Sequence, residues 1–499
     1  MRDLIARVVP SGDISQRSVA SGIWAGFGNV STRGLQLIKL VIIANFLPPS
    51  EFGLMGIALL ATSAFQRFLT LGLDQALIHH DAVDVDTYLD SVWSVKIIRG
   101  LLILLVGWFA APILGDFFRA ERAVPLIRAL AVSPLLVSFA NPAIVYFQKD
   151  LAFHLEFIYR FSGALLNVAS AIAAAYLLGT VWALVIGNIT GKVVQLIVSY
   201  LIRDYRPSFE IRLDLLSDLI GYSKWVTVSN PLTFIIGEGD DAFVAWFLGA
   251  SSLGLYQISY RFSNSPATEI TSVLDKVMFP AIARTRNERE RAVKWYRHML
   301  TLTAVVTIPM ATGIALVAPA FVYSLLGMEW ENAIPVIQVL AFFGAVRSIT
   351  AVDGSVVRAL GRPDISTKTH VLTLFLMILT LFPLSSHLGL IGTSIAVSAS
   401  LLIASVPRTY AATQLVGLPK RNWLIAVIHP LVASGGMAIA VLTISIFVET
   451  TALVTLLFQV ITGIIVYVGF TVLLARLTNY NVFTIIEQML HTMESPNES

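Results

Sequence analysis

Long apolar segments separated by short polar breaks recur along the whole chain. Most of them reach about 20 residues, which is the length that a helix needs to cross a hydrocarbon core of about 30 Å. This pattern predicts about fourteen transmembrane helices. We place them at residues 18–47, 52–78, 88–115, 122–147, 153–179, 181–202, 217–248, 250–280, 297–326, 331–360, 366–386, 388–413, 423–447 and 453–476.

Composition supports the same interpretation, because 56% of the residues are hydrophobic and only 13% are charged. A soluble protein would be expected to have about a quarter of its residues charged. The sequence therefore predicts an all-α polytopic membrane protein. Residues 1–17 have no apolar core, so we interpret them as a cytoplasmic N-terminal segment and not as a cleaved signal peptide. The chain has no cysteine, which excludes disulfides and thiolate chemistry, and no metal or other cofactor is expected.

Basic residues are concentrated in alternate loops, which predicts the orientation of the chain. The loops assigned after spans 4, 6, 8, 10 and 12 carry Lys149, Arg160, Arg203, Arg206, Arg212, Arg284, Arg286, Arg289, Arg291, Lys294, Arg297, Arg358, Arg362, Lys368, Arg408, Lys420 and Arg421. The loops after spans 5, 7, 9, 11 and 13 carry none. Positive residues stay on the cytoplasmic side, so we expect a protein of the cell membrane with both termini in the cytoplasm. The basic segment 116–123, which should lie outside, is an exception.

The net charge of +3 follows from these loops, and it indicates contact with anionic membrane lipids. Nucleic acid is not an expected partner, since the chain has no basic soluble domain.

A short motif occurs twice, and its spacing predicts the domain organisation. The chain reads FLPPSEFGL at residues 46–54 and FLGASSLGL at 247–255, an offset of 201 residues or six predicted spans. A parallel repeat of this kind predicts two pseudo-symmetric six-helix lobes around a central cavity. The predicted parts are the N-terminus 1–17, the first lobe 18–202, a cytoplasmic linker 203–216, the second lobe 217–413, two extra helices at 423–476 and a cytoplasmic tail 477–499.

Six basic residues lie inside apolar spans, where each costs about 2.5–3.5 kcal/mol on insertion scales. They are Arg33, Lys39, Arg67, Lys192, Arg261 and Arg347. Polar residues at helical spacing accompany them, as in the stripes Asn29, Thr32, Gln36, Lys39 and Asn188, Lys192, Gln195, Ser199. Narrow polar faces on apolar helices point into a bundle or a wet cavity. We therefore predict a cationic cavity that binds an anionic cargo, because arginine donates two parallel hydrogen bonds to a phosphate.

The alternative is that these residues form structural ion pairs, such as Arg67 with Asp74 or Arg261 with Asp275. Both interpretations stay open for the second lobe, which contains more acidic residues. Carboxylates at membrane depth are also candidates for ion coupling, and they are Asp74, Glu238, Asp240 and Asp241.

Almost the whole chain resembles the Wzx-type lipid-linked oligosaccharide flippases of the multidrug/oligosaccharidyl-lipid/polysaccharide exporter superfamily. The resemblance is carried by ANFLPPSEFGLMGIAL, LGLDQALIHH, DDAFVAWFLGASSLGLYQISYRF, VMFPAIAR, LLGMEWENAIPVIQVLAF, RALGRPD and LGLIGTSIAVS. It implies fourteen helices that move an undecaprenyl- or dolichyl-diphosphate-linked glycan from the inner to the outer leaflet by alternating access. It also implies substrate-binding roles for Arg33, Lys39, Arg67 and Arg261, while Lys192 and Arg347 rest on the burial of charge alone.

Two other functions are alternatives to a flippase. A MATE-like drug or cation antiporter should have an acidic first lobe, but span 18–47 holds two cations and no carboxylate. A membrane glycosyltransferase or glycan polymerase should have a large outer domain, and every predicted outer loop is short. We therefore expect a transporter that is not an enzyme, with glycan-assembly enzymes as possible partners.

Overall fold

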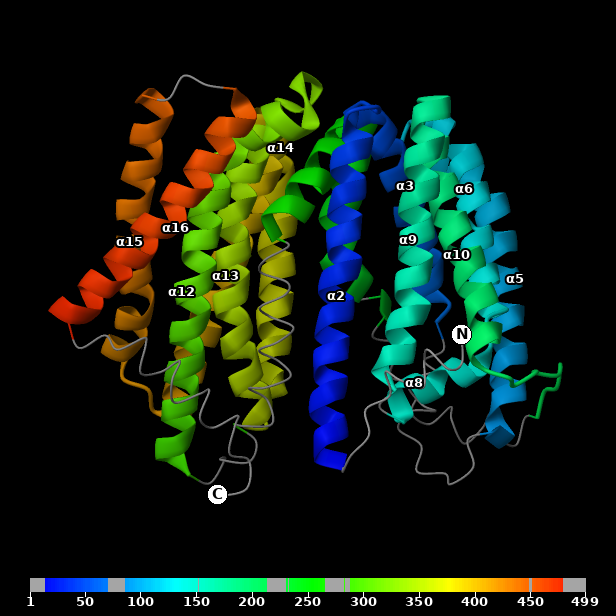
Figure 1. Ribbon diagram of the computed structural model, residues 1–499, viewed down its shortest axis with the longest axis horizontal. Coiled ribbons are helices and arrows are strands. Elements are labelled where there is room, and N and C mark those ends of the chain that lie inside the picture. Colours follow the sequence, from blue (N-terminus) through cyan, green and yellow to red (C-terminus); the bar gives the residue numbers. More distant parts are fainter. Residues whose placement is uncertain are drawn as a thin grey trace. The chain divides into compact units, whose positions relative to one another are not determined.

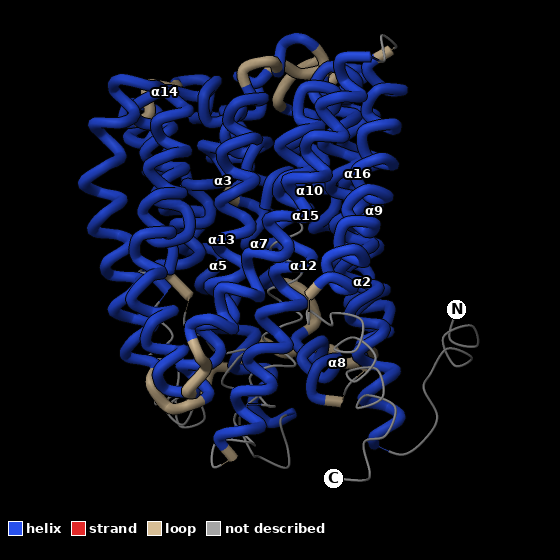
Figure 2. Tube along the Cα trace, turned by 90° about the vertical axis from the view of Figure 1, so that its left-hand side faces the viewer, coloured by secondary structure: helices blue, strands red, loops and turns tan. Residues whose placement is uncertain are grey.

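The computed structural model describes residues 14–70, 86–150, 152–212, 230–231, 233–264, 282, 288–447 and 451–478. Helices and the loops between them make up this part of the chain, which contains no β-strand (Figure 2). The chain divides into two compact units, Met1–Gly254 and Leu255–Ser499, and most of their helices are labelled in Figure 1. An all-helical fold is confirmed for the described residues, and the predicted lobe boundary at 203–216 stays a prediction.

The first unit combines long helices with a bent span. Its helices are α2 (Ile14–Ala44), α3 (Pro49–Phe68), α5 (Asp86–Phe117), α6 (Val124–Leu130), α7 (Val132–Ser138), α8 (Tyr146–Lys149), α9 (Phe153–Leu178) and α10 (Trp182–Ile202). The fourth predicted span bends by 78° between Glu121–Ser138 and Pro142–Lys149. Proline lacks the N–H of a helix and disfavours helical backbone before it. The Asn141 side chain instead accepts a hydrogen bond from the backbone nitrogen of Ala143 at 3.0 Å.

The second unit contains α12 (Arg289–Phe321), α13 (Ala333–Ala359), α14 (Pro363–Val416), α15 (Lys420–Phe447) and α16 (Ala452–Leu477). Another helix, Thr233–Asn264, continues from the first unit into the second. Two of these elements are interrupted by a glycine in the left-handed region, Gly389 in α14 with φ of 57° and Gly249 with φ of 86°. Glycine adopts such a backbone without steric penalty. Both interruptions coincide with predicted boundaries between spans, so each long element holds two predicted spans.

The exposed surfaces of these helices are apolar over long distances. Phe109, Ile113 and Phe447 are 73%, 70% and 80% exposed, and they represent many similar side chains. Within the described part of the chain, nine helices are long and apolar enough to cross a membrane, or ten if the bent pair counts as one span. Apolar surface of this extent is stable in contact with lipid. The chain is therefore a multi-pass membrane protein, and the total of fourteen spans stays a prediction.

The repeated motif marks a close reciprocal contact inside the first unit. A Cβ atom on Gly53 of α3 would lie 1.6 Å from the carbonyl oxygen of Ala250, and one on Gly254 would lie 2.0 Å from that of Pro49. Gly53 corresponds to Gly254 in the repeat, and Pro49 corresponds to Ala250. Each copy therefore contributes the same two positions to the contact. Backbones approach this closely only where a glycine removes the side chain, which explains why both copies of the motif carry one.

The basic segment that was an exception to the charge pattern is partly neutralised by Glu51. Arg122 Nη2 donates to Glu51 Oε1 at 2.6 Å, and the backbone nitrogen of Val181 donates to Glu51 Oε2 at 2.8 Å. Glu51 is only 7% exposed, so its carboxylate needs such partners. This residue of the first repeat copy thus links the start of α3 to segment 116–123 and to the start of α10.

Residues 203–212, the start of the predicted linker, are held against α5. The Asp90 carboxylate accepts hydrogen bonds from Tyr205 Oη at 2.8 Å, Ser208 N at 3.0 Å and Ser208 Oγ at 2.8 Å. Burial, together with the hydrogen bond to Asp90, raises the pKa of Tyr205 above its ordinary value. The phenol therefore stays protonated and acts as the donor. The start of the predicted linker therefore has a defined position against α5.

Replacing Asp90 with alanine should release this segment. Hydrogen bonds to a charged acceptor contribute about 1.5 kcal/mol or more each, so losing all three should speed amide hydrogen exchange at Tyr205, Arg206 and Ser208 roughly 1,000-fold. Glu210→Ala is the matched control, because the Glu210 side chain is exposed and forms an ion pair with Arg212 at 3.4 Å. Equal exchange in the parent and the Asp90 variant would show that Asp90 does not hold the segment.

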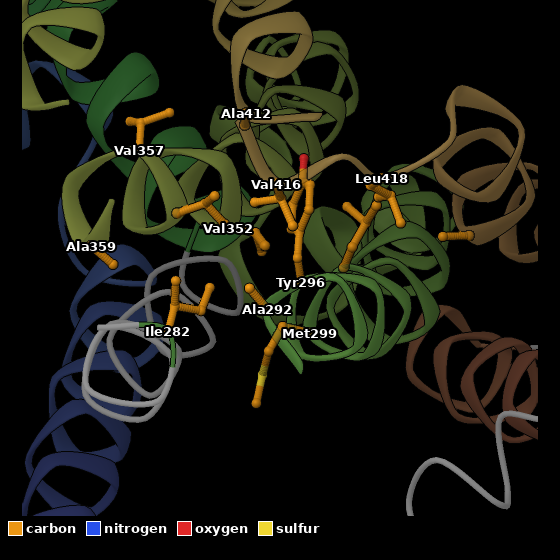
Figure 3. Close-up of a cluster of buried hydrophobic side chains, with 13 residues drawn as sticks. Ile282, Ala292, Tyr296, Met299, Val352, Val357, Ala359, Ala412, Val416 and Leu418 are labelled. Carbon is orange, nitrogen blue, oxygen red and sulfur yellow. The ribbon is translucent and has the colours of Figure 1, made fainter. Parts of the chain in front are cut away.

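A buried cluster from α12, α13 and α14 forms part of the core of the second unit. Tyr296 of α12 is fully buried there and lies among Val352 of α13 and Val416 of α14 (Figure 3). Its hydroxyl donates a hydrogen bond to Asp353 Oδ1 at 2.7 Å. The core of this unit therefore also contains a buried carboxylate, which the sequence pattern did not indicate.

Candidate functional site

A polar cavity of about 260 Å³ lies in the first unit between α2, α9 and α10. Apart from Gly163, Ala164 and Gly191, its lining side chains carry amide, hydroxyl or cationic groups. These are Asn29, Thr32, Arg33, Gln36, Arg160, Asn167, Asn188, Lys192 and Gln195. Most of the two polar stripes predicted for the first and sixth spans line this one cavity. We call it the first-unit cavity.

Small residues bring α9 and α10 together beside the first-unit cavity. A Cβ atom on Gly191 would lie 2.8 Å from the carbonyl oxygen of Gly163, and one on Gly163 would lie 2.4 Å from Gln195 Cγ. Close helix contact through small residues is the usual way in which membrane helices gain packing contacts. The approach also places the amides of Asn167 and Gln195 on neighbouring helices at the cavity.

Both lysines among the six predicted cations have polar partners at or beside the first-unit cavity. Lys39 Nζ donates to Asn167 Oδ1 at 2.9 Å, so it anchors a lining amide without lining the cavity itself. Lys192 Nζ donates to Gln195 Oε1 at 3.2 Å and does line the cavity. Both acceptors are neutral amide oxygens, so neither of these two hydrogen bonds adds a negative charge beside the lysine.

The charge of the lining is positive. Arg33, Arg160 and Lys192 contribute cations, and among the described residues no carboxylate lines the first-unit cavity. Glu156, one helical turn before Arg160, forms an ion pair with it at 2.7 Å and offsets part of this charge. The potential of the cavity therefore favours anions, and the partial exclusion of water strengthens that preference.

Arg160 was not among the predicted site residues, because its charge led us to place it in a cytoplasmic loop. In the structure it lies in α9, whose residues Arg160, Gly163, Ala164 and Asn167 all line the first-unit cavity. Spacings of three and four residues put these positions on one helical face. This periodicity could have shown that α9 lines the first-unit cavity together with α2 and α10. It was overlooked because Gly163 and Ala164 are small and look apolar.

Arg67 is placed differently from the cavity cations. It is exposed near the end of α3, outside the first-unit cavity, and it interacts electrostatically with Glu238 of the helix Thr233–Asn264. Asp240, two residues further along, is buried, and Asp241, three residues further along, is half-buried. The structure thus brings Arg67 near a predicted coupling carboxylate, while Asp74 lies outside the described residues.

The two remaining predicted cations belong to the second unit. Arg347 of α13 is half-buried, and its Nη1 donates to Tyr260 Oη at 2.8 Å. Arg261, the next residue after Tyr260, is exposed. The roles of all six predicted cations in substrate binding stay predictions.

The first-unit cavity combines groups that suit an anionic, polyhydroxylated ligand. Guanidinium and ammonium groups bind phosphate oxygens, and amides both donate to and accept from sugar hydroxyls. Its volume is slightly below the roughly 300–1,000 Å³ of pockets that enclose drug-sized ligands. It therefore has room for part of a large amphiphile, such as a phosphate group with an adjoining sugar. Among the described residues, no group of three or more side chains suited to binding a metal ion occurs.

A family model described as "Polysaccharide biosynthesis protein" matches residues 42–335, more than half of the chain. The chain belongs to this family. As predicted, it is a Wzx-type member of the multidrug/oligosaccharidyl-lipid/polysaccharide exporter superfamily.

Two relatives illustrate the range of this family. The lipopolysaccharide biosynthesis protein WzxC of Escherichia coli K12 is 22% identical over 77% of this chain and 78% of its own length. The probable low-salt glycan biosynthesis flippase Agl15 of Haloferax volcanii is 24% identical over 80% of this chain and 84% of its own length.

Solved structures share the fold of this family member. The lipid II flippase MurJ in an inward closed conformation has a TM-score of 0.73 at 14% identity, covering 91% of this chain and 99% of MurJ. An inward-facing multidrug MATE transporter has a TM-score of 0.62 at 14% identity, covering 78% of this chain and 94% of the transporter. The likeness to both proteins concerns the fold alone, so function has to be argued from the site.

Proposed function

We propose that the chain is a flippase that moves an isoprenoid-diphosphate-linked oligosaccharide from the inner to the outer leaflet by alternating access. The cargo would serve the assembly of a surface polysaccharide or a protein-linked glycan. The observation that carries this proposal is the first-unit cavity, where cations and amides occur together and no carboxylate from the described part of the chain lines the wall. The names of relatives such as Agl15 support the same class of function.

In the proposed mechanism, Arg33 and Lys192 bind the diphosphate, and the amides of α2, α9 and α10 contact the first sugars. Binding the charged group in the cavity lowers the free energy of moving it through the membrane, because an unpaired phosphate in hydrocarbon would be far more costly. The isoprenoid chain would stay in lipid, which its apolar character favours.

A MATE-like antiporter is the second candidate on the same fold. Its cationic cargo would need acidic side chains in the cavity, and the lining of the first-unit cavity supplies cations in their place. The carboxylates Glu238, Asp240 and Asp241 lie away from this lining and suit a different role. We propose these three carboxylates as the ion-coupling group, in which Glu238 interacts electrostatically with Arg67 nearby.

The remaining parts of the proposal concern location and partners. We place the chain in the cell membrane with both termini in the cytoplasm, in contact with anionic lipids and with enzymes of glycan assembly. The carrier lipid would be undecaprenyl or dolichyl. The proposal does not distinguish the two, because the cavity lining would bind the charged group and not the isoprenoid chain.

Deleting the gene in its host should abolish the surface glycan and cause lipid-linked oligosaccharide to accumulate in the inner leaflet. Mass spectrometry of extracted lipids measures the accumulation, and expression of the intact gene should reverse it. Normal glycan accompanied by increased sensitivity to cationic drugs would instead favour the antiporter.

A further inference from the structure

A large apolar groove lies in the second unit between α12, α13, α14 and α15, which are labelled in Figure 1. Its volume is about 580 Å³, and most of its lining is aliphatic or aromatic, as Ile308, Phe342, Leu402 and Val427 illustrate. Among the described residues, no carboxylate lines it. An apolar space is a poor site for water, which would lose hydrogen bonds there. We call this space the second-unit groove.

The hydroxyl groups in the lining are already used by the protein. Thr312, Thr350, Ser405 and Thr413 each donate to a backbone carbonyl three or four residues earlier, at 2.7–3.1 Å. Thr409 donates to a buried carboxylate of α13. Hydroxyls that donate within the protein in this way leave little polar surface for a ligand. The wall of the second-unit groove therefore suits a hydrocarbon chain.

One end of the second-unit groove carries residues that are typical of a membrane–water interface. Lys420 Nζ lies 5.2 Å from the centre of the Tyr410 ring, and Trp423 lines the groove three residues further along α15. Tyrosine and tryptophan are enriched at this depth of a membrane, and lysine extends its ammonium group to the lipid headgroups. The charge pattern places this end on the cytoplasmic side.

The length of the second-unit groove corresponds to one leaflet. Its α15 wall extends from Lys420 to Leu431, which is about 16 Å at 1.5 Å per residue. Half of a hydrocarbon core is about 15 Å. The lining residues Leu402, Val406 and Leu431 are exposed, so the groove is open along its side. A lipid chain could therefore enter from the surrounding membrane, with its headgroup at the end that carries Lys420.

We propose that the second-unit groove binds one acyl chain of an anionic phospholipid, whose phosphate group lies at Lys420. The apolar wall binds the chain, and the ammonium group attracts the charged headgroup. The isoprenoid chain of a glycan carrier is much longer than this groove, which favours a phospholipid as the occupant. The bound chain would fill the space between α15 and its neighbours and so stabilise the second unit. The proposal does not rest on the flippase function.

The test uses the purified full-length chain in detergent, freed of bound lipid, and measures its thermal unfolding midpoint. Phosphatidylglycerol and phosphatidylcholine with the same acyl chains are the two probes, so they differ only in their headgroups. A ligand that binds only the folded state raises the midpoint with concentration, which gives its apparent affinity. We expect about fivefold tighter binding of phosphatidylglycerol, the ratio expected from one cation near the membrane surface. Equal affinities, or no stabilisation by either lipid, would overturn the proposal.

A charge substitution locates the headgroup. Lys420→Gln should weaken binding of phosphatidylglycerol about fivefold and leave binding of phosphatidylcholine unchanged, because the charge alone is removed. Arg421→Gln is the matched control, since it removes an exposed cation from the next residue, which does not line the second-unit groove. It should keep the parental preference. A preserved preference in Lys420→Gln, or an equal loss in Arg421→Gln, would contradict a headgroup at Lys420.

A bulky substitution locates the acyl chain. Val406 lines the second-unit groove and is 62% exposed, so Val406→Trp should block the groove and weaken binding of both lipids about tenfold or more. Val371→Trp is the matched control, because Val371 also lies in α14, is 63% exposed and does not line the groove. Without added lipid, both variants should unfold near the parental midpoint, as expected for changes at exposed positions. Parental affinity in Val406→Trp would refute the proposal.

Undecaprenyl phosphate is the third probe, and it distinguishes the proposed phospholipid from a glycan carrier. We expect it to stabilise the Val406→Trp variant as much as the parent, because its chain does not use the second-unit groove. Stabilisation of the parent by undecaprenyl phosphate that is lost in Val406→Trp, without any stabilisation by phosphatidylglycerol, would show that the groove holds the carrier. That result would overturn the proposal and leave the flippase function standing.

Discussion

Replacing Arg33 or Lys192 with alanine is expected to abolish glycan export without lowering the amount of protein in the membrane. Both side chains line the first-unit cavity, whose described lining residues include no carboxylate. Losing one partner of a desolvated charged contact costs about 2–5 kcal/mol, which weakens binding by more than tenfold. Removing a cation from a span also makes insertion easier by about 3 kcal/mol. Surface glycan and membrane protein level, measured on the same cells, separate the two effects.

Conservative and distant substitutions refine this prediction. Arg33→Lys should retain part of the activity, because the charge survives while the bidentate geometry is lost. Lys368→Ala is the control, since that lysine is 78% exposed and pairs with Asp364 on the surface at 3.3 Å. Export at the parental rate in both alanine variants would refute the cationic-cavity mechanism. Loss of the variants from the membrane would show that Arg33 and Lys192 are structural.

Replacing Gly53 or Gly254 with alanine is expected to force apart the two helices that carry the repeated motif. The new Cβ atoms would lie 1.6 Å and 2.0 Å from backbone carbonyl oxygens, and a backbone atom cannot rotate away as a side chain can. Overpacking a tight contact costs about 1–3 kcal/mol, and a clash with backbone falls at or above the upper end of that range. We expect the thermal unfolding midpoint to fall in each variant.

Cysteine labelling measures the separation directly, because the chain has no cysteine of its own. A single Ala250→Cys change should react slowly with an impermeant maleimide in the parent background and faster when Gly53→Ala is added. Gly34→Ala is the matched control, since a Cβ atom on that helical glycine would meet no atom within 4 Å. Unchanged labelling and stability in the Gly53 variant would mean that the contact is not tightly packed.

The sequence predicted those features that depend on local periodicity. The stripes around Arg33 and Lys192 were visible because polar residues at steps of three and four share a helical face. The helical breaks at Gly249 and Gly389 were visible because short polar or glycine-containing gaps separate apolar runs. In the same way, the repeat identified Gly53 and Gly254, although only the structure shows that they belong to one contact.

Features that depend on distant residues could not be predicted in this way. The sequence suggested Asp74 as a partner for Arg67, and that pair stays a prediction because Asp74 lies outside the described residues. The structure places Glu238 near Arg67 from a helix about 170 residues later, which the sequence did not indicate. The buried Asp353 was overlooked because its partners, Tyr296 and Thr409, are neutral and far away in sequence. Long-range pairing of this kind follows from tertiary packing, which a single-sequence pattern does not encode.

The most direct measurement uses proteoliposomes that contain the purified chain and a fluorescent isoprenoid-diphosphate-linked oligosaccharide. A membrane-impermeant quencher reports how much of this lipid has moved between the leaflets. The proposed mechanism predicts movement in the parent and none in the Arg33→Ala, Lys192→Ala double variant, with equal amounts of both proteins reconstituted. Movement at the parental rate in the double variant, or no movement in the parent, would contradict it.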